Sequence, residues 1–345
     1  MVIYKRKMGE KKIKTLKEIA EELGVSIASV SYVYNNKWKE NGLSTSLAER
    51  IARKLKEDNY RPNSLGLQLK TKRTQTIGII LEDMTRRFNL DILAGIEKVL
   101  ATKGYFTLVC SSNLGELEKK QLETLLERNP DGIIFTPETN EPGTLNIVKE
   151  VKERNIPIVL VDNYFPEIKT DFVVSDNYSG AYQAVKYLIK KGKRKIAYIG
   201  AKKDITGLRD RFKGYTAALI EADISVNRDL IGEHLPDIFS RDIPDAIFVD
   251  SLMYFKEGFK FLSENNYKIP DDILITGFDP VDLSLSEMQN IGFHSLVKQP
   301  IPFVEQDGVR MGELAAEIII KRIKGEKRKK TFSRIFLTPT LKFFN

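Results

Sequence analysis

Short apolar runs alternate with longer amphipathic stretches along residues 76–278, and this alternation constrains the fold more than any other feature. A short apolar run bounded by turn residues indicates a buried strand, whereas apolar residues every three to four positions indicate a helix. Strands that alternate with helices favour parallel sheets covered by helices on both faces. The stretch from residue 76 to residue 345 is too long for one ordinary sheet, so we expect two doubly wound α/β subdomains.

The pattern also gives the approximate position of each element. The expected strands cover residues 76–81, 105–110, 132–135, 157–161, 172–174, 195–199, 246–249, 273–278 and 332–337. The expected helices of this region cover residues 88–100, 116–128, 144–155, 178–191, 208–222 and 252–265.

Aspartates follow several of these strands at the point where ligands bind to open α/β sheets, beyond the carboxyl ends of the strands. The five residues are Asp83, Asp162, Asp176, Asp250 and Asp279. A single aspartate after a strand commonly caps the next helix. Five at equivalent positions around a shared crevice predict a site lined with carboxylates that accept hydrogen bonds from hydroxyl groups, which suits a sugar.

The excess positive charge is confined to the first fifth of the chain. The net charge is +8, and residues 1–75 hold 17 Lys and Arg against 8 Asp and Glu, whereas the rest holds 38 against 39. Such asymmetry indicates a head that binds a polyanion, attached to a neutral body. A solubilising basic tail would explain Lys5 to Lys14, but not the charge that continues through an amphipathic helical region.

Two short helices joined by a tight turn are expected at the start of the head. Thr15 and Glu18 form a capping box before the first helix, and Gly24 ends it. Ser26 caps the second helix. The residues expected on the inner face of the second helix are Ile27, Val30, Val33 and Tyr34. This arrangement is a helix-turn-helix.

A third helix and a short linker complete the head. The helix is expected over residues 47–58, with Ser46 and Glu49 as its capping pair. The stretch 61–73 is too short to be a stable helix alone, and Gly66 weakens it further. We therefore expect this stretch to become ordered only against DNA.

Composition excludes several other classes of protein. No apolar run approaches the ~18–20 residues needed to span a bilayer, and no signal peptide is recognisable, so we expect a cytoplasmic protein. The single cysteine, Cys110, excludes an internal disulfide framework. The two histidines, His234 and His294, have no metal-ligand spacing, and the phosphate-loop, dinucleotide and hydrolase motifs are absent. We expect no enzyme activity, no metal and no cofactor.

The chain resembles the lac repressor and galactose repressor family of bacterial transcription regulators over almost its full length. The residues that carry the resemblance in the head are Thr15 to Ala20, Gly24 to Ser26, Ala28 to Ser31, Val33, Asn35, Asn36 and Tyr60 to Asn63. In the body they are Thr76 to Gly78, Asp131 to Ile134, Val174 to Asn177, Gly180, Lys195 to Gly200, Arg211 to Tyr215, Gly277 to Asp279, Gln299 and Pro300.

In the head, the resemblance implies that the second helix enters the major groove of DNA and that a leucine after it wedges into the minor groove. The implied DNA-binding residues are Ile27, Ala28, Ser29, Ser31, Tyr32, Asn35, Leu69 and Lys70. The family commonly has Arg where this chain has Tyr32, and Tyr32 cannot contact guanine through two hydrogen bonds. The operator is therefore expected to depart from the common half-site of the family.

In the body, the resemblance implies the fold of the periplasmic sugar-binding proteins and an effector between the two subdomains. It implies that Asp176, Arg211 and Asp279 contact the effector and that Phe88 stacks near it. Together with the strand-end aspartates, the expected effector-binding residues are Asp83, Phe88, Thr136, Asp162, Asp176, Arg211, Asp250 and Asp279. Arg86 and Arg87 replace uncharged residues that are common in the family. They lie either in a solvated turn or in a site that admits an acidic sugar.

These observations predict a helix-turn-helix head over 1–60, a hinge over 61–75 and an effector-binding body over 76–345. The first subdomain is expected to comprise 76–175 and 301–327, and the second 176–300 and 328–345. We expect a homodimeric repressor that binds a pseudo-palindromic operator in double-stranded DNA and responds to a sugar. A sugar-binding transport receptor, or a regulator that responds to a nucleobase or an acidic sugar, is the alternative.

Overall fold

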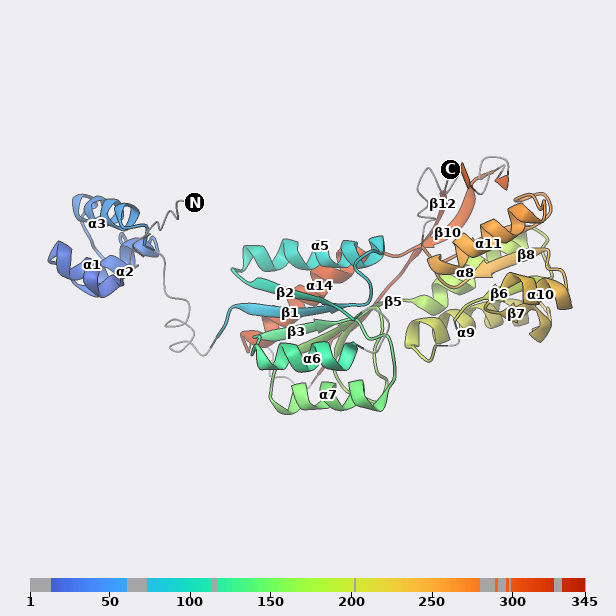
Figure 1. Cartoon of the computed structure of the whole chain (residues 1–345), viewed down its shortest axis with the longest axis horizontal. Coiled ribbons are helices and arrows are strands. Elements are labelled where there is room, and N and C mark those ends of the chain that lie inside the picture. Colours follow the sequence, from blue (N-terminus) through green and yellow to red (C-terminus); the bar gives the residue numbers. More distant parts are fainter. Residues whose placement is uncertain are drawn as a thin grey trace, which may run out of the picture. The chain divides into compact units, whose positions relative to one another are not determined.

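The computed structural model describes residues 14–60, 73–112, 117–201, 203–279, 289–290, 296–297, 299–325 and 331–344. Contacts between residues divide the chain into two compact units, Met1–Thr74 and Gln75–Asn345. The described part of the first unit contains only helices, and the second unit is α/β (Figure 1). The predicted DNA-binding residues Leu69 and Lys70 lie outside the described residues.

The first unit contains three helices, α1 (Leu16–Leu23), α2 (Ile27–Tyr34) and α3 (Thr45–Glu57). The predicted capping box is present, because the Thr15 side chain accepts from the Glu18 N–H and the Glu18 side chain accepts from the Thr15 N–H. Gly24 ends α1 with a φ of 65°, in the left-handed region that glycine adopts without strain. The short turn between α1 and α2 gives the predicted helix-turn-helix.

Two predictions about these helices were wrong. The third helix begins at Thr45 rather than residue 47, and its cap is Ser44, whose hydroxyl accepts from the Leu47 N–H at 3.3 Å. Ile27 and Tyr34 do not face inward, since they are 48% and 43% exposed. The core is formed by Ile19, Ala20, Val30 and Ile51 instead.

The second unit contains two parallel sheets, and the first of them has the strand order β11-β5-β4-β3-β1-β2. Its strands are β1 (Thr76–Leu81), β2 (Phe106–Ser111), β3 (Gly132–Phe135), β4 (Ile158–Val161), β5 (Asp171–Ser175) and β11 (Arg334–Leu337). Side chains alternate across this sheet, as β4 illustrates. Val159 and Val161 pack against one pair of helices, whereas Ile158 and Leu160 pack against the other pair.

The helices on the first face are α5 (Arg87–Thr102) and α14 (Gly308–Ile323), and those on the other face are α6 (Glu118–Glu127) and α7 (Pro142–Glu153) (Figure 1). Glycines allow α5 and α14 to lie in backbone contact. A Cβ on Gly95 would lie 2.0 Å from the Val309 carbonyl oxygen, and one on Gly312 would lie 2.0 Å from the Ile92 carbonyl oxygen.

The second sheet has the order β7-β6-β8-β9, which corresponds to β2-β1-β3-β4 of the first. Its strands are β6 (Ile196–Ile199), β7 (Ile231–Gly232), β8 (Ala246–Val249) and β9 (Leu274–Gly277). Ala246 and Phe248 face the helices α8 (Asn177–Lys190) and α9 (Thr206–Glu221). Ile247 and Val249 face α10 (Leu235–Arg241) and α11 (Leu252–Glu264). An antiparallel pair, β10 (Ile301–Glu305) and β12 (Thr340–Phe344), adjoins this sheet through the bridge between Phe278 and Val304.

The prediction of parallel sheets covered by helices on both faces is confirmed. The sequence patterns did not reveal β7, α10, β10, α14 or β12. The expected subdomain bounds are corrected in two places. Residues 334–337 pair with β5 in the first sheet, although 328–345 was assigned to the second subdomain. Residues 301–305 lie beside the second sheet, although 301–327 was assigned to the first.

Candidate functional site

A cavity of about 390 Å³ lies in the second unit, at the carboxyl ends of strands from both sheets. The residues that line it are Glu82, Arg86, Arg87, Phe88, Asn89, Asp91, Pro137, Glu138, Asp162, Asn163, Ala201, Lys203, Ile205, Gly207, Leu208, Arg211, Ser251, Leu252, Asp279, Glu305 and Gln306. Four of the eight predicted effector-binding residues are among them, namely Phe88, Asp162, Arg211 and Asp279.

Arg211 of α9 is a cation held by three neighbours and is only 6% exposed. Its Nε donates to the Asn177 side-chain oxygen at 2.7 Å, one terminal nitrogen donates to the Asp250 carbonyl, and the other donates to the Gln306 side chain at 3.4 Å. Its guanidinium lies over the Phe278 ring at 3.8 Å from the centroid. A guanidinium has five N–H groups in a rigid plane, so this anchored side chain retains donors for a ligand.

Asp162 and Asp279 occupy equivalent positions after β4 and β9. Each has a φ of 65°, and each donates its backbone N–H to the next strand, to the carbonyls of Val173 and Val304. Burial raises the pKa of Asp162 to about 6, and the positive charge of Arg211 partly offsets that effect. Burial likewise raises the pKa of Asp279, again against the attraction of Arg211. The two carboxyls thus line the same cavity as one buried cation, whose charge acts on both.

The other four predicted effector-binding residues do not line the cavity. Asp176 caps α8, since its carboxylate accepts from the Ser179 N–H at 3.0 Å and the Ser179 hydroxyl at 2.7 Å. Asp83 accepts from the Thr85 N–H at 2.8 Å. Asp250 is buried and accepts from the Tyr198 hydroxyl at 3.1 Å. Thr136 is also buried, at 1% exposure.

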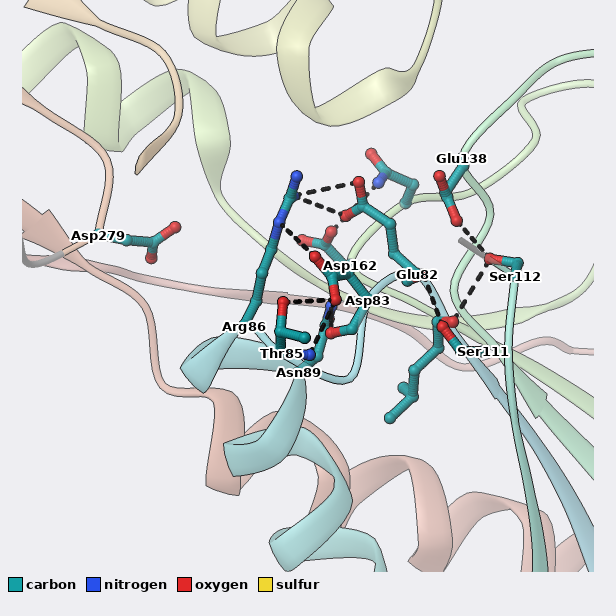
Figure 2. Close-up of polar contacts among 12 residues, drawn as sticks. Glu82, Asp83, Thr85, Arg86, Asn89, Ser111, Ser112, Glu138, Asp162 and Asp279 are labelled. Atoms are coloured by element: carbon teal, nitrogen blue, oxygen red, sulfur yellow. Dashed lines mark hydrogen bonds and ion pairs between the residues drawn. The ribbon is translucent and has the colours of Figure 1, made fainter. Parts of the chain in front are cut away.

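Arg86 is neutralised within the protein. Its guanidinium donates to both oxygens of Glu82 at 3.0 and 3.1 Å and lies 3.5 Å from a carboxylate oxygen of Asp83 (Figure 2). Arg87 is largely exposed and lies 3.9 Å from Asp91. Both arginines line the cavity, but each is accompanied by a carboxylate. This pairing does not support the expectation that they admit an acidic sugar.

Glu138 is a cavity residue that was absent from the predicted set, and it is 2% exposed. The Ser112 hydroxyl donates to one oxygen of its carboxylate (Figure 2). Burial raises the pKa of Glu138. The acidic residues in that set were aspartates close to the ends of strands, whereas Glu138 lies three residues beyond the end of β3. A search of the whole loop after each strand for acidic residues would have found it.

The candidate DNA-reading surface lies on α2, in the first unit. Ile27, Ala28 and Asn35 are exposed, whereas Ser29, Ser31 and Tyr32 are partly buried. The backbone of Ser29 and the side chain of Asn35 also make hydrogen bonds at the helix ends. The Ser29 N–H donates to the Ser26 hydroxyl at 3.0 Å, and the Asn35 amide donates to the Ser31 carbonyl at 2.9 Å. Five of the six residues therefore lie on the helix that the sequence assigned to DNA, and Asn35 is the C-cap of that helix.

Both units match known families. The model described as "Bacterial regulatory proteins, lacI family" matches residues 15–63. The model described as "Periplasmic binding proteins and sugar binding domain of LacI family" matches residues 74–338, more than half of the chain. The protein belongs to the LacI family. The resemblance inferred from the sequence is thereby confirmed.

Relatives in the LacI family cover nearly the whole chain. The HTH-type transcriptional regulator RegA of Clostridium saccharobutylicum is 31% identical over 323 residues, which cover 89% of this chain and 92% of RegA. The ribose operon repressor of Escherichia coli K12 is 27% identical over 342 residues, which cover 95% and 98%. A structure of the Lac repressor bound to ONPG in the repressed state has a TM-score of 0.78, at 20% identity and coverage of 96% and 99%.

Membership of the LacI family makes this chain a DNA-binding transcription regulator, and these relatives are regulators rather than enzymes. Within the described residues, no helix is long and apolar enough to cross a membrane.

Proposed function

We propose that the protein is a transcription repressor whose operator affinity is controlled by a sugar bound in the cavity of the second unit. The observation that carries this proposal is the cavity chemistry: the acceptors Asp162 and Asp279 line the same cavity as the anchored donor Arg211. Ligand sites combine a shaped cavity with a few fixed polar groups. Carboxylates beside a guanidinium suit a molecule with several hydroxyl groups. The ribose operon repressor, a relative along almost the full chain, supports a sugar.

The proposed coupling between sugar binding and DNA binding rests on which sheet each cavity-lining residue belongs to. Glu82, Glu138 and Asp162 follow strands of the first sheet, whereas Arg211 and Asp279 belong to elements of the second. A sugar that contacts both groups favours the arrangement of the sheets in which all contacts are made. It can shift DNA binding only by its difference in affinity between the two arrangements.

Operator recognition is assigned to α2 of the head. Ile27, Ala28 and Tyr32 would contact base edges, because the N-terminal part of this helix enters the major groove in helix-turn-helix proteins. We propose a homodimer that acts in the cytoplasm, with two heads on a pseudo-palindrome. The basic charge of residues 1–75 supplies the phosphate contacts.

Two measurements test the proposal. Selection of DNA from a random library by the full-length protein should give a pseudo-palindromic site, with an affinity that falls steeply as salt concentration rises. A thermal-shift screen of sugars should then give at least one that raises the melting midpoint. If the selected DNA molecules share no sequence, or if the affinity of the protein for DNA does not depend on salt, the assignment of a DNA-binding repressor is contradicted.

A further inference from the structure

The carboxylate of Glu138 is only half satisfied by the protein. One oxygen accepts from the Ser112 hydroxyl, whereas Oε2 is buried and has no hydrogen-bond partner among the described residues. Glu138 is 2% exposed and lines the cavity. Buried polar atoms without a partner are rare, because each loses its hydrogen bonds to water without replacement. A ligand in the cavity is the natural source of the missing donor.

The loop that carries Glu138 is held in place by a second buried carboxylate. Glu118 lies at the start of α6 and is fully buried. One of its oxygens accepts from the Glu138 N–H, and the other accepts from the hydroxyls of Thr139 at 3.0 Å and Thr144 at 3.2 Å. Three contacts to one carboxylate fix the path of the chain between β3 and α7. Such preorganisation is characteristic of a binding residue.

The charged groups that line the cavity provide little free positive charge to bind an anion. The acidic residues that line it are Glu82, Asp91, Glu138, Asp162, Asp279 and Glu305, and the basic ones are Arg86, Arg87, Lys203 and Arg211. Arg86 is bound by Glu82, and Arg87 is largely exposed beside Asp91. Lys203 is exposed. Arg211 is therefore the one buried cation among these lining residues, and its charge already acts on the carboxyls of Asp162 and Asp279.

We propose that Glu138 is a specificity residue that accepts a hydrogen bond from a hydroxyl group of the effector, and that the cavity selects uncharged sugars over phosphorylated or carboxylated ones. This inference rests on the proposed function and narrows it to one class of ligand. The physical basis is repulsion: a phosphate or carboxylate would be placed beside Glu138, Asp162 and Asp279. Like charges in a binding site cost enough to reduce affinity by about a hundredfold or more.

The test uses the full-length protein and sugars in matched pairs, measured by isothermal titration calorimetry after a thermal-shift screen. The probes are ribose, glucose and galactose; the charged counterparts are ribose 5-phosphate for ribose, glucose 6-phosphate and glucuronate for glucose, and galacturonate for galactose. We expect an uncharged sugar to bind at least about a hundredfold more tightly than its charged counterpart. A charged member that binds as tightly as its parent would overturn the selection but leave the sugar-controlled repressor in place. If no member binds, both the sugar effector and this inference are contradicted.

The role of Glu138 is tested with the sugar that binds. Glu138→Gln should weaken binding of that sugar by about tenfold, because a carboxylate acceptor is lost. It should also reduce the difference in affinity between the sugar and its charged counterpart. Glu141→Gln is the matched control, since Glu141 is an exposed carboxylate of the same loop that does not line the cavity. If Glu138→Gln does not fold, Ser112→Ala is used instead. It removes the hydroxyl that orients the Glu138 carboxylate and should also weaken sugar binding. Unchanged sugar affinity in whichever variant folds would overturn the role of Glu138.

Discussion

Replacing the buried Glu118 by Gln should make protein stability less dependent on pH. Burial raises the pKa of Glu118 from 4.5 to about 7, although it accepts hydrogen bonds from the Glu138 N–H and from two threonines. The folded protein therefore binds this proton more tightly than the unfolded chain does. The stabilisation is fully present below pH 4.5 and is lost as pH rises through 7. A tenfold change in proton affinity is worth about 1.4 kcal/mol, so the loss amounts to about 3 kcal/mol.

Gln keeps the shape of Glu118 and an acceptor for the Glu138 N–H, but it carries no charge at any pH. We expect Glu118→Gln to be close to wild type in free energy of unfolding at pH 4 and more stable by about 3 kcal/mol at pH 8. The difference between the two proteins isolates Glu118 from other titrating groups, such as Asp250, whose pKa burial raises to about 6.

Urea unfolding from pH 4 to pH 8, followed by circular dichroism, gives this difference. Fluorescence of Trp38, the single tryptophan, reports on the first unit and serves as an internal control. The reasoning is refuted if the stability difference between variant and wild type stays constant across this range, or if the variant becomes relatively less stable as pH rises.

Three further predictions concern packing, recognition and pH. Gly312→Ala should lower the free energy of unfolding by about 1–3 kcal/mol, because its Cβ would meet the α5 backbone. Gly143→Ala, whose Cβ has only ordinary contacts, should not lower it in the same urea titration. Ile27→Ala should weaken operator binding in fluorescence anisotropy by about 1–3 kcal/mol without a change in sugar affinity, and equal affinity would remove Ile27 from the DNA-reading surface. Sugar affinity measured by calorimetry should fall as pH drops through about 6, where Asp162 gains a proton and loses an acceptor, and Asp162→Asn should remove that dependence.

The central strands of the sheets could be predicted because they are buried on both faces and are therefore apolar. β4, with the sequence Ile-Val-Leu-Val, is an example. The sheet to which the strands near the C-terminus belong could not be predicted in the same way. β11 has exposed residues at alternate positions and lies at an edge of its sheet, so nothing local indicates which sheet it joins.

Of the five aspartates predicted from the ends of strands, Asp162 and Asp279 line the cavity, whereas Asp83, Asp176 and Asp250 do not. Asp176 is followed at once by α8, so its side chain turns to the free N–H groups of that helix. Asp162 is followed by a loop, and both Asp162 and Asp279 adopt a left-handed backbone and line the cavity. Glu118 and Glu138 could not be recognised as buried, because charged residues are normally placed at the surface. Only the tertiary fold supplies the partners that allow their burial.

The proposed function requires that ligand binding in the cavity changes the affinity of the head for DNA. The direct measurement is operator affinity by fluorescence anisotropy, with and without a saturating concentration of the sugar found in the screen. We expect the dissociation constant to change at least about tenfold in wild type, and to stay constant in Asp279→Ala, which should bind the operator normally without sugar. A sugar that binds in the cavity of the wild-type protein and leaves its operator affinity unchanged would contradict the account.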